Sequence, residues 1–385
     1  MFSKKTFCRA ILLVFVFFCA FSTCAEDVRL FVPEKIYAVP GVEMNVYFNN
    51  IVTVINPANY VFDVDCSKGR NDRKRWRFTP QKSDTGTYKW SLRVIGMNGV
   101  VARAEAQLIV LPFDAGSQKN ITMLMVGASQ TSAGYYADRM VELMKRPGNP
   151  GFKTIGSKGR QGKHEGYGGW GWGSFLIRWG FTNSKKMDGM HPDRPVGFNS
   201  PFLFPDENGK GKFDLQKYFD KYNNGKAPDV VSFQLGLNDF FSAKDHNIAA
   251  TTANSIRSME KLIAEFRKFK PAPEIMIFQH IPGSGQDSFG ANYACGQTAW
   301  QYRKNLDFYN RELLKKGKEL KVTVVPIYMN IDTENNFPVK RQPVNGDNKA
   351  MIFRQNNGVH PAPAGYFQMG DTLYCCLKAL LHNKK

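Results

Sequence analysis

The spacing of apolar residues changes near residue 120, and this change divides the chain into two parts of different fold class. Before residue 120, short runs rich in Val, Phe, Tyr and Trp recur at intervals of roughly 10–15 residues, which is typical of all-β domains. After it, continuous apolar runs such as residues 229–235 are typical of strands buried on both faces, and helical patterns separate them. Strands that alternate with helices indicate βαβ units and a parallel sheet.

The N-terminal part is expected to be a small all-β domain. Tyr88, Trp90 and Leu92 alternate with polar residues, as in a strand with one buried face. We therefore expect an immunoglobulin-like sandwich at residues 26–113, followed by a linker at residues 114–119. The runs expected to form its strands are residues 28–33, 45–50, 60–65, 75–80, 87–96 and 106–112.

The C-terminal part, residues 120–385, is expected to be an α/β domain. Its expected strands are residues 122–126, 153–156, 229–235, 274–279 and 321–327, and its expected helices are about residues 129–146, 252–269, 300–320 and 364–381. Ligands of open parallel sheets bind at the carboxyl ends of the strands. Functional side chains are therefore expected at that edge of the sheet.

Residues 1–25 have the features of a secretory signal peptide. Lys4, Lys5 and Arg9 precede a short apolar run, and residues 23–25 resemble a small-residue cleavage site. The run is too short to span a membrane, and no other stretch approaches the roughly 18 apolar residues that a transmembrane helix needs. We therefore expect a secreted or periplasmic protein with no transmembrane segment.

Removal of this segment lowers the formal net charge from +19 to +16. The most basic segment, residues 68–77, carries six basic residues and one acidic residue, and is most simply a solvated loop. Since nucleic-acid binding requires an intracellular target, we expect no nucleic-acid partner. A positive charge can also favour contact with anionic glycans or envelope surfaces.

Four of the seven cysteines remain after cleavage, and none has the spacing of a metal site. Two of the four are adjacent, so we interpret them mainly as buried small apolar residues, with a disulfide as the alternative: Cys66, Cys295, Cys375 and Cys376. The histidines show no metal-binding spacing either. We expect no metal and no cofactor.

Three side chains suited to acyl transfer are expected at the carboxyl edge of the sheet. Ser129 and Asn238 each follow an expected strand, and His360 precedes the last expected helix. Between the first two, residues 165–172 form a glycine-rich loop that can present backbone amides. A serine can attack a carbonyl carbon, a histidine can accept its proton, and amides can hold the oxyanion. Considered alone, Ser129 has a simpler explanation as a helix cap and Asn238 as a turn residue.

The order Gly-Ala-Ser, Gly, Gly-x-Asn-Asp and His-Pro resembles the SGNH (GDSL-type) hydrolase superfamily of esterases and lipases. The resemblance covers residues 120–382 and implies a flavodoxin-like three-layer αβα sandwich. Residues 165–172, 199–202 and 212–214 also look like secreted bacterial members associated with carbohydrate deacetylation.

The family pattern implies a role for each matched residue. It implies that Ser129 is the nucleophile and that its amide is the first oxyanion donor. Gly169 is then the second donor, Asn238 the third, and His360 the base. Gly166 and Gly168 are alternatives to Gly169 as the second donor. Ser284, between two glycines, is a rival serine without the strand-to-helix elbow of a nucleophile.

Two residues depart from the family pattern. Ala128 stands where the first motif usually has Asp, a residue that mostly organises loops. Asn357 stands three residues before His360, where the family places the Asp that orients the base. An Asn carbonyl can accept the imidazole N–H but cannot stabilise the imidazolium by charge, and this change lowers kcat about 10⁴-fold in a chymotrypsin-type triad. A backbone carbonyl or Asp347 is an alternative orienting group.

The glycine-rich loop allows two other interpretations. Residues 166–171 match G-x-G-x-x-G but follow a polar stretch instead of a strand, which argues against dinucleotide binding. Trp170 and Trp172 are equally compatible with stacking on sugar rings and with packing inside the protein.

The function that fits best is a secreted serine esterase that removes acyl groups, acetyl above all, from an acylated carbohydrate. One alternative is a catalytically impaired SGNH-fold protein that binds glycans, because Asn357 replaces the orienting Asp. Another is a lipid or aryl esterase. A lipase needs a long apolar cleft, and the Gly-, Trp- and polar-rich loops of residues 157–212 give little sign of one.

Overall fold

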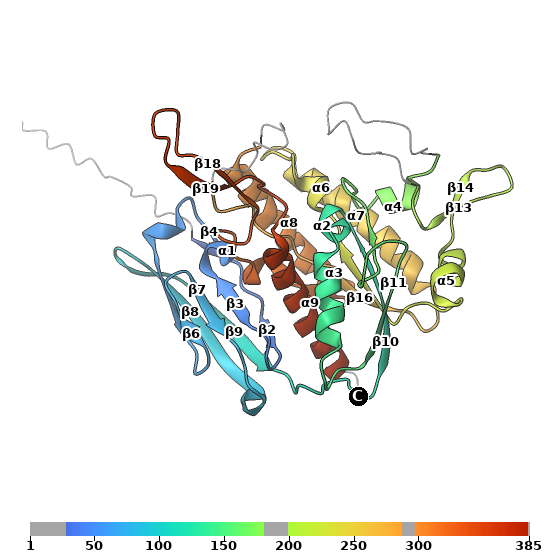
Figure 1. The fold of residues 1–385 in the computed structure, drawn as a ribbon, viewed down its shortest axis with the longest axis horizontal. Coiled ribbons are helices and arrows are strands. Elements are labelled where there is room, and N and C mark those ends of the chain that lie inside the picture. The colour runs from blue at the N-terminus through green and yellow to red at the C-terminus, as the bar shows by residue number, and fades with distance from the viewer. Residues whose placement is uncertain (1–27, 181–198, 287–296, 384–385) are drawn as a thin grey trace, which may run out of the picture.

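The computed structural model describes residues 28–180, 199–286 and 297–383, which are drawn in colour in Figure 1. The expected signal peptide and Cys295 lie outside these residues. None of the helices in the described ranges is long and apolar enough to cross a membrane.

A six-stranded sheet lies at the centre of the C-terminal part. Its strands are β10 (Asn120–Gly127), β11 (Gly151–Ile155), β12 (Glu165–Gly166), β15 (Val230–Gln234), β16 (Glu274–Phe278) and β17 (Thr323–Val325). The path through the sheet is β11-β10-β15-β16-β17, β12 also pairs with β10, and every pair is parallel. Numbered along the chain, the five strands of this path follow the order 2-1-3-4-5 found in flavodoxin-like sheets. The predicted α/β fold with a parallel sheet is confirmed.

Helices cover both faces of this sheet (Figure 1). They are α3 (Tyr135–Met144) and α9 (Pro363–Asn383) on one face, and α5 (Leu215–Asn223), α7 (Ile248–Arg267) and α8 (Ala299–Glu319) on the other. Alternate residues of β10 contribute to the two layers: Met123 and Met125 pack with α3 and α9, whereas Leu124 and Val126 pack with the other set. Because both faces are buried, most positions of β10, β15 and β16 are apolar, which explains the apolar runs in the sequence. Ser232 and Gln234 of β15 are buried polar exceptions.

The helix expected after Ser129 is broken into two. α2 (Ser129–Ser132) ends before Gly134, whose φ of 79° lies in the left-handed region, and α3 begins at the next residue. The start of α2 also packs closely on the sheet, since a Cβ at Gly127 would lie 1.9 Å from the Thr131 hydroxyl. The glycine before Ala128-Ser129 thus allows the serine to sit directly on the end of β10.

The N-terminal part contains several small sheets. Its strands are β1 (Arg29–Leu30), β2 (Lys35–Ala38), β3 (Met44–Tyr47), β4 (Val52–Thr53), β5 (Val61–Asp65), β6 (Arg70–Asn71), β7 (Arg75–Phe78), β8 (Gly86–Gly96) and β9 (Gly99–Val110). They form sheets in the orders β2-β9-β8-β5, β3-β7-β6 and β1-β4. Trp76 of β7 and Trp90 of β8 meet edge to face, with ring centroids 6.3 Å apart. The immunoglobulin-like arrangement and the boundaries at residues 113 and 119 stay predictions.

One expected strand of this part is wrong in its second half. The run at residues 45–50 passes from β3 into α1 (Phe48–Ile51). Asn50 in this turn of helix is buried, and its Nδ2 donates to the Tyr328 and Ile331 carbonyls at 2.8 and 2.7 Å. A tertiary contact therefore decides the local structure, and no pattern in the run itself announces it.

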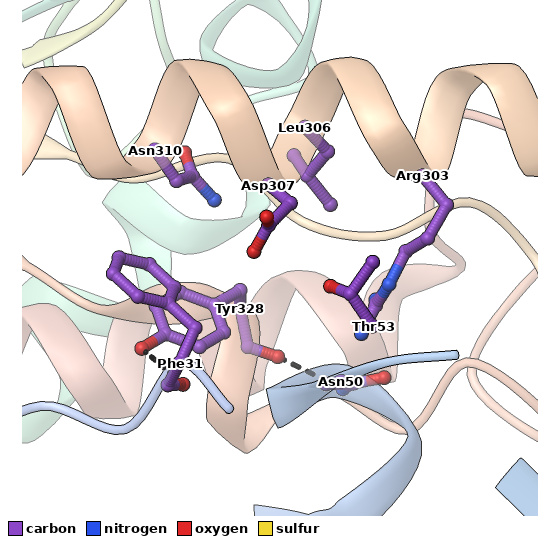
Figure 2. A pocket seen from close by; sticks show the side chains of 8 residues that line it. All are labelled: Phe31, Asn50, Thr53, Arg303, Leu306, Asp307, Asn310 and Tyr328. Atoms are coloured by element: carbon purple, nitrogen blue, oxygen red, sulfur yellow. Dashed lines mark hydrogen bonds between the residues drawn. The ribbon is translucent and has the colours of Figure 1, made fainter. Parts of the chain in front are cut away.

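The two parts share one hydrophobic cluster, which joins Trp76 and Trp90 to Leu373 and Leu377 of α9. Figure 1 shows the N-terminal sheets beside that helix. Figure 2 shows another portion of the contact, where side chains of α8 face N-terminal residues around a small pocket. There Arg303 of α8 donates to the Asn49 and Val52 carbonyls. The N-terminal sheets are thus packed firmly onto the α/β part.

Two antiparallel hairpins have no counterpart in the predicted elements. One pairs β13 (Leu203–Pro205) with β14 (Gly211–Phe213), and the other pairs β18 (Val339–Pro343) with β19 (Met351–Gln355). The β18–β19 hairpin projects at the upper left of Figure 1 and leads into the segment that carries His360.

Candidate active site

The fold brings Ser129 and His360 into contact. Ser129 is the first residue of α2, at the carboxyl end of β10, and His360 lies between β19 and α9. The His360 Nε2 and Ser129 Oγ atoms are 2.7 Å apart, and both residues are partly exposed. This hydrogen bond joins a hydroxyl to the imidazole nitrogen that can take its proton, the geometry required of a nucleophile and its base.

Asn238 lies at the same edge of the sheet, in α6 (Leu237–Phe240) directly after β15. Its side chain is exposed, and its Nδ2 donates to the Trp170 carbonyl at 2.9 Å. The turn before it requires glycine, because Gly236 has a φ of 124° and a Cβ there would lie 2.2 Å from the Tyr309 hydroxyl. The bond to Trp170 connects Asn238 to the glycine-rich loop, and an amide nitrogen carries a second hydrogen for another acceptor.

The three glycines weighed as oxyanion donors lie in different surroundings. Gly166 is buried in β12, where a Cβ would meet the Ser132 amide nitrogen at 2.4 Å. Gly168 is exposed, and a Cβ there would lie 4.0 Å from the Cβ of Ser129. Gly169 is exposed as well and has a φ of 77°. The loop therefore brings exposed backbone next to the serine, while the donor role of Gly169 stays a prediction.

A buried glutamate anchors the first half of this loop. Glu165 is fully buried, and its carboxylate accepts hydrogen bonds from the Ser157 amide and hydroxyl at 2.6 and 2.7 Å. The Tyr167 and Tyr218 hydroxyls donate to it at 2.9 and 2.7 Å. Four donors satisfy the carboxylate and fix the backbone that leads to Gly168. Sequence reasoning missed this role, because the tyrosine and serine partners are not recognisable from spacing.

A second carboxylate anchors the other half. Asp239 accepts from the Trp172 amide at 3.4 Å and from the Ser255 hydroxyl at 3.1 Å, and a Cβ at Gly171 would lie 2.1 Å from its Oδ1. Burial raises the pKa of the Asp239 carboxyl, and its two hydrogen bonds oppose this shift. The Asn238-Asp239 pair thus contacts the loop twice, with the amide at Trp170 and the carboxylate at Trp172.

The two tryptophans of the loop pack inside the protein. Trp170 and Trp172 are 2 % and 0 % exposed, and Trp170 stacks on Tyr167 with ring centroids 4.2 Å apart. The Trp172 indole N–H donates to the Tyr309 hydroxyl at 3.2 Å. Of the two interpretations left open by the sequence, stacking on sugar rings is wrong for both residues because neither ring is accessible.

Asn357 organises the segment that carries the histidine. Its Oδ1 accepts hydrogen bonds from the backbone amides of Val359 and His360, at 3.0 and 2.8 Å. These bonds fix the backbone on both sides of the Val359 carbonyl carbon. The expected contact with the imidazole stays a prediction. Asp347 lies in the exposed turn of the β18–β19 hairpin, where its amide bonds to the Asn345 side chain.

The rival serine and the cysteines are placed differently from Ser129. Ser284 is 8 % exposed, and its amide donates to the Gly358 carbonyl at 3.0 Å, so it packs behind the histidine segment. Cys66, Cys375 and Cys376 are free thiols, and the last two are buried in α9. Within the described ranges, no group of three or more His, Cys, Asp or Glu side chains could hold a metal ion.

Comparison with known proteins gives one informative match. Residues 123–373 match the family model described as GDSL-like Lipase/Acylhydrolase. No curated protein matches the chain.

Three of the solved structures that match the chain do so at low identity. A carbohydrate acetylesterase family member from Sinorhizobium meliloti has 16 % identity and a TM-score of 0.38, over 68 % of this chain and 99 % of that chain. An acetylxylan esterase from Geobacillus stearothermophilus has 14 % identity and a TM-score of 0.35, over 67 % and 94 %. A putative arylesterase from Agrobacterium tumefaciens has 15 % identity and a TM-score of 0.39, over 67 % and 99 %. Likenesses of this strength carry no argument about substrate.

Proposed function

The chain belongs to the GDSL-like lipase/acylhydrolase family, and from this premise we propose that it is a serine esterase that removes acetyl groups from carbohydrates. The observation that carries the proposal is the 2.7 Å contact between Ser129 Oγ and His360 Nε2. Ser129 is also partly exposed, so a substrate carbonyl can reach it. Both facts favour catalysis over the alternative of an impaired, glycan-binding scaffold.

In the proposed reaction the Ser129 hydroxyl attacks the acetyl carbonyl carbon while His360 accepts the hydroxyl proton. The carbonyl oxygen becomes an oxyanion, held by the Ser129 and Gly169 amides and by the second N–H of the Asn238 side-chain amide. Collapse of this intermediate expels the sugar oxygen, which takes the proton from His360. Water then attacks the acetyl-serine while His360 accepts a proton from the water. The second intermediate expels the Ser129 oxygen, which takes the proton back from His360, and acetate leaves.

The protein's loops prepare these donors before substrate arrives. The Asn238 amide is held at the Trp170 carbonyl, and Glu165 and Asp239 anchor the glycine-rich loop from either side. Preorganised donors stabilise developing charge without reorganisation, and loss of one such donor costs about 10²–10³-fold in kcat. Asn357 contributes by holding the His360 backbone, in place of the family's Asp.

Two features support a carbohydrate as the alcohol part of the substrate. The residues beside Ser129 in the loop are glycines with exposed backbone, which leaves room for a bulky alcohol such as a sugar. The segments at residues 165–172 and 199–202 resemble those of secreted bacterial carbohydrate deacetylases. Residues 1–25 support export of the protein to the place where such a polysaccharide substrate is found.

The test is hydrolysis of p-nitrophenyl acetate by the wild type, Ser129→Ala and the matched control Ser132→Ala, whose exposed serine lies in the same helix. We expect the control to keep wild-type turnover and Ser129→Ala to lose about 10³-fold or more. An equal rate for Ser129→Ala and wild type would refute the nucleophile.

A second comparison tests the substrate class. Acetylated xylan oligosaccharides and long-chain p-nitrophenyl esters are offered to the wild type at equal concentration. We expect kcat/KM for acetate release from the acetylated sugars to be higher than kcat/KM for hydrolysis of any long-chain ester. The reverse order would favour a lipid or aryl esterase, and silence toward all esters, with binding of the sugars, would favour the glycan-binding alternative.

A further inference from the structure

A buried glutamine next to the nucleophile forms a hydrogen bond to the histidine segment, which lies 229 positions away in the sequence. Gln130 directly follows Ser129 and is 1 % exposed. Its Nε2 donates to the Val359 carbonyl at 3.1 Å, and Val359 directly precedes His360. Each end of this hydrogen bond is therefore one residue away from a reacting side chain.

A second glutamine fixes the orientation of the first. Gln234, the last residue of β15, donates from its Nε2 to the Gln130 Oε1 at 2.6 Å, and its carbonyl accepts the Ala128 amide at 3.2 Å. A backbone carbonyl can only accept, so Gln130 has to present its NH₂ group to Val359 and its oxygen to Gln234. Gln234 holds this arrangement although its own Oε1 is buried and meets no hydrogen-bond donor among the described residues.

Together with Asn357, this pair clamps a single peptide group. The carbonyl of the Val359–His360 peptide accepts from Gln130, and its N–H donates to Asn357 Oδ1 at 2.8 Å. A peptide group is planar, so holding both of its polar ends fixes its orientation and with it the Cα of His360. The preceding chain comes from the projecting β18–β19 hairpin, in which Phe353 is 69 % exposed. The Gly358 carbonyl, which accepts the Ser284 amide at 3.0 Å, is a further restraint on this segment.

We propose that Gln130, supported by Gln234, is a positioning residue that sets the Ser129–His360 hydrogen bond from the nucleophile's side. The inference rests on the proposed esterase function, because it assigns the purpose of the clamp to that reaction. A misplacement of about 1 Å at a reacting group can cost about 10²-fold in rate. Loss of the clamp therefore affects kcat, while the surfaces that bind the substrate stay intact.

The chain offers a matched control for this proposal. Gln279 follows β16, is 2 % exposed, and donates from its Nε2 to the Asn310 carbonyl at the same 3.1 Å. It has the chemistry and burial of Gln130 without a bond to either the Ser129 or the His360 segment. Gln130→Met and Gln279→Met each remove one buried amide, keep the approximate volume and leave a carbonyl unsatisfied. Gln130→Met also leaves the Gln234 Nε2 without its acceptor, so we expect this variant to lose somewhat more stability.

The experiment measures kcat and KM for p-nitrophenyl acetate in both variants, with melting temperature as the measure of stability. For Gln130→Met we expect kcat to fall roughly 10–100-fold while KM stays within about 2-fold of wild type. For Gln279→Met we expect both constants within about 3-fold of wild type. Equal losses of kcat in the two variants, or a rise in KM alone, would overturn the positioning role.

The pH dependence of kcat in Gln130→Glu distinguishes a positioning role from a merely structural one. A protonated glutamic acid can donate to the Val359 carbonyl and accept from Gln234, whereas the carboxylate cannot donate. We expect kcat of this variant to approach the wild-type value at the acidic end of the active range and to fall as pH rises. We expect no such decline in wild type or in Gln279→Glu. Parallel pH profiles for the three proteins would contradict the clamp.

A measurement that needs no turnover separates the clamp from the proposed function. Amide hydrogen exchange at residues 356–362 is followed by mass spectrometry in wild type, Gln130→Met and Gln279→Met. We expect faster exchange in this segment only for Gln130→Met. If wild type hydrolyses no ester, the esterase proposal fails and exchange alone decides the clamp. If wild type is active and exchange is unchanged in Gln130→Met, the clamp fails and the esterase stands.

Discussion

The N-terminal sheets and the α/β part both contain buried amide side chains, but these serve different ends. Asn50, in α1, donates to two carbonyls of the segment after β17 and thereby joins the N-terminal part to the rest. Gln130, which is buried, and Asn357, which is half-buried, lie in the α/β part and bond to the backbone beside a reacting side chain. The same chemical group thus stabilises an interface in one region and orients a site in the other.

This difference implies that the two regions respond differently to the loss of an amide. Removing an amide at the interface leaves buried carbonyls without donors and lowers the free energy of unfolding, while the site is untouched. Removing one at the site also leaves buried groups unpaired and lowers stability, but in addition it displaces a reacting side chain and so lowers the rate. Three experiments can break or sharpen this contrast.

The largest effect is expected for Asn238→Ala. This variant loses a donor to the oxyanion and the bond to the Trp170 carbonyl, and we expect kcat for p-nitrophenyl acetate to fall about 10²–10³-fold. The matched control is Asn208→Ala, in the exposed turn between β13 and β14, which should keep wild-type kcat. A loss below about 3-fold for Asn238→Ala would remove this side chain from the oxyanion site.

An intermediate effect is expected from acid, and it belongs to the α/β part alone, because residues 28–113 contain no histidine. Burial lowers the pKa of His280 from 6.5 to about 4, and its Nε2 bonds to the Leu235 carbonyl at 3.0 Å. Burial also lowers the pKa of His164, beneath the glycine-rich loop, to about 4. The unfolded chain therefore takes up these protons first, and stability falls as pH drops from about 6.5 toward 4.

Each of these histidines should cost about 2 kcal/mol of unfolding free energy between pH 7 and pH 5. Urea unfolding at the two pH values measures this loss. We expect the loss of stability between pH 7 and pH 5 to be about 2 kcal/mol smaller in His280→Gln than in wild type. In the exposed-site control His246→Gln we expect the loss to equal that of wild type. If His280→Gln loses as much stability between the two pH values as wild type does, this imidazole is not the group that resists protonation.

The smallest effect is expected at the interface of Figure 2, where Asn50 lies next to Arg303 of α8. Asn50→Ala leaves the Tyr328 and Ile331 carbonyls without their donor, and we expect a loss of about 1–2 kcal/mol in unfolding free energy. Esterase kcat should stay within about 2-fold of wild type at 25 °C. Exposed Asn59→Ala is the control. A large fall in kcat for folded Asn50→Ala would erase the contrast between the two regions.

Much of the α/β part is readable from the sequence because its strands are buried on both faces. That burial favours apolar residues at most positions, as in residues 122–126 and 229–235. The break between α2 and α3 is not readable, since it depends on the φ of Gly134 and on the packing of Thr131 against Gly127. The β18–β19 hairpin is hidden as well, because its exposed Phe353 breaks the usual alternation of a strand.

The site divides in the same way. Ser129 and Asn238 are recognisable because each follows a strand at the carboxyl edge of the sheet, and His360 because it precedes the last helix. The residues that hold them are not, because Gln130 and Asp239 act through partners far away in the sequence. Hydrogen-bond partners of this kind follow from the fold and leave no spacing pattern.

The most direct test of the site is covalent trapping with a fluorophosphonate, followed by mass spectrometry of the labelled peptide. We expect one phosphonate group on Ser129, no label in Ser129→Ala, and much slower labelling in His360→Gln, because the hydroxyl at 2.7 Å from the imidazole is the activated one. A label on Ser284 or another residue, or equal labelling rates in wild type and His360→Gln, would contradict the assignment of Ser129 and His360 as nucleophile and base.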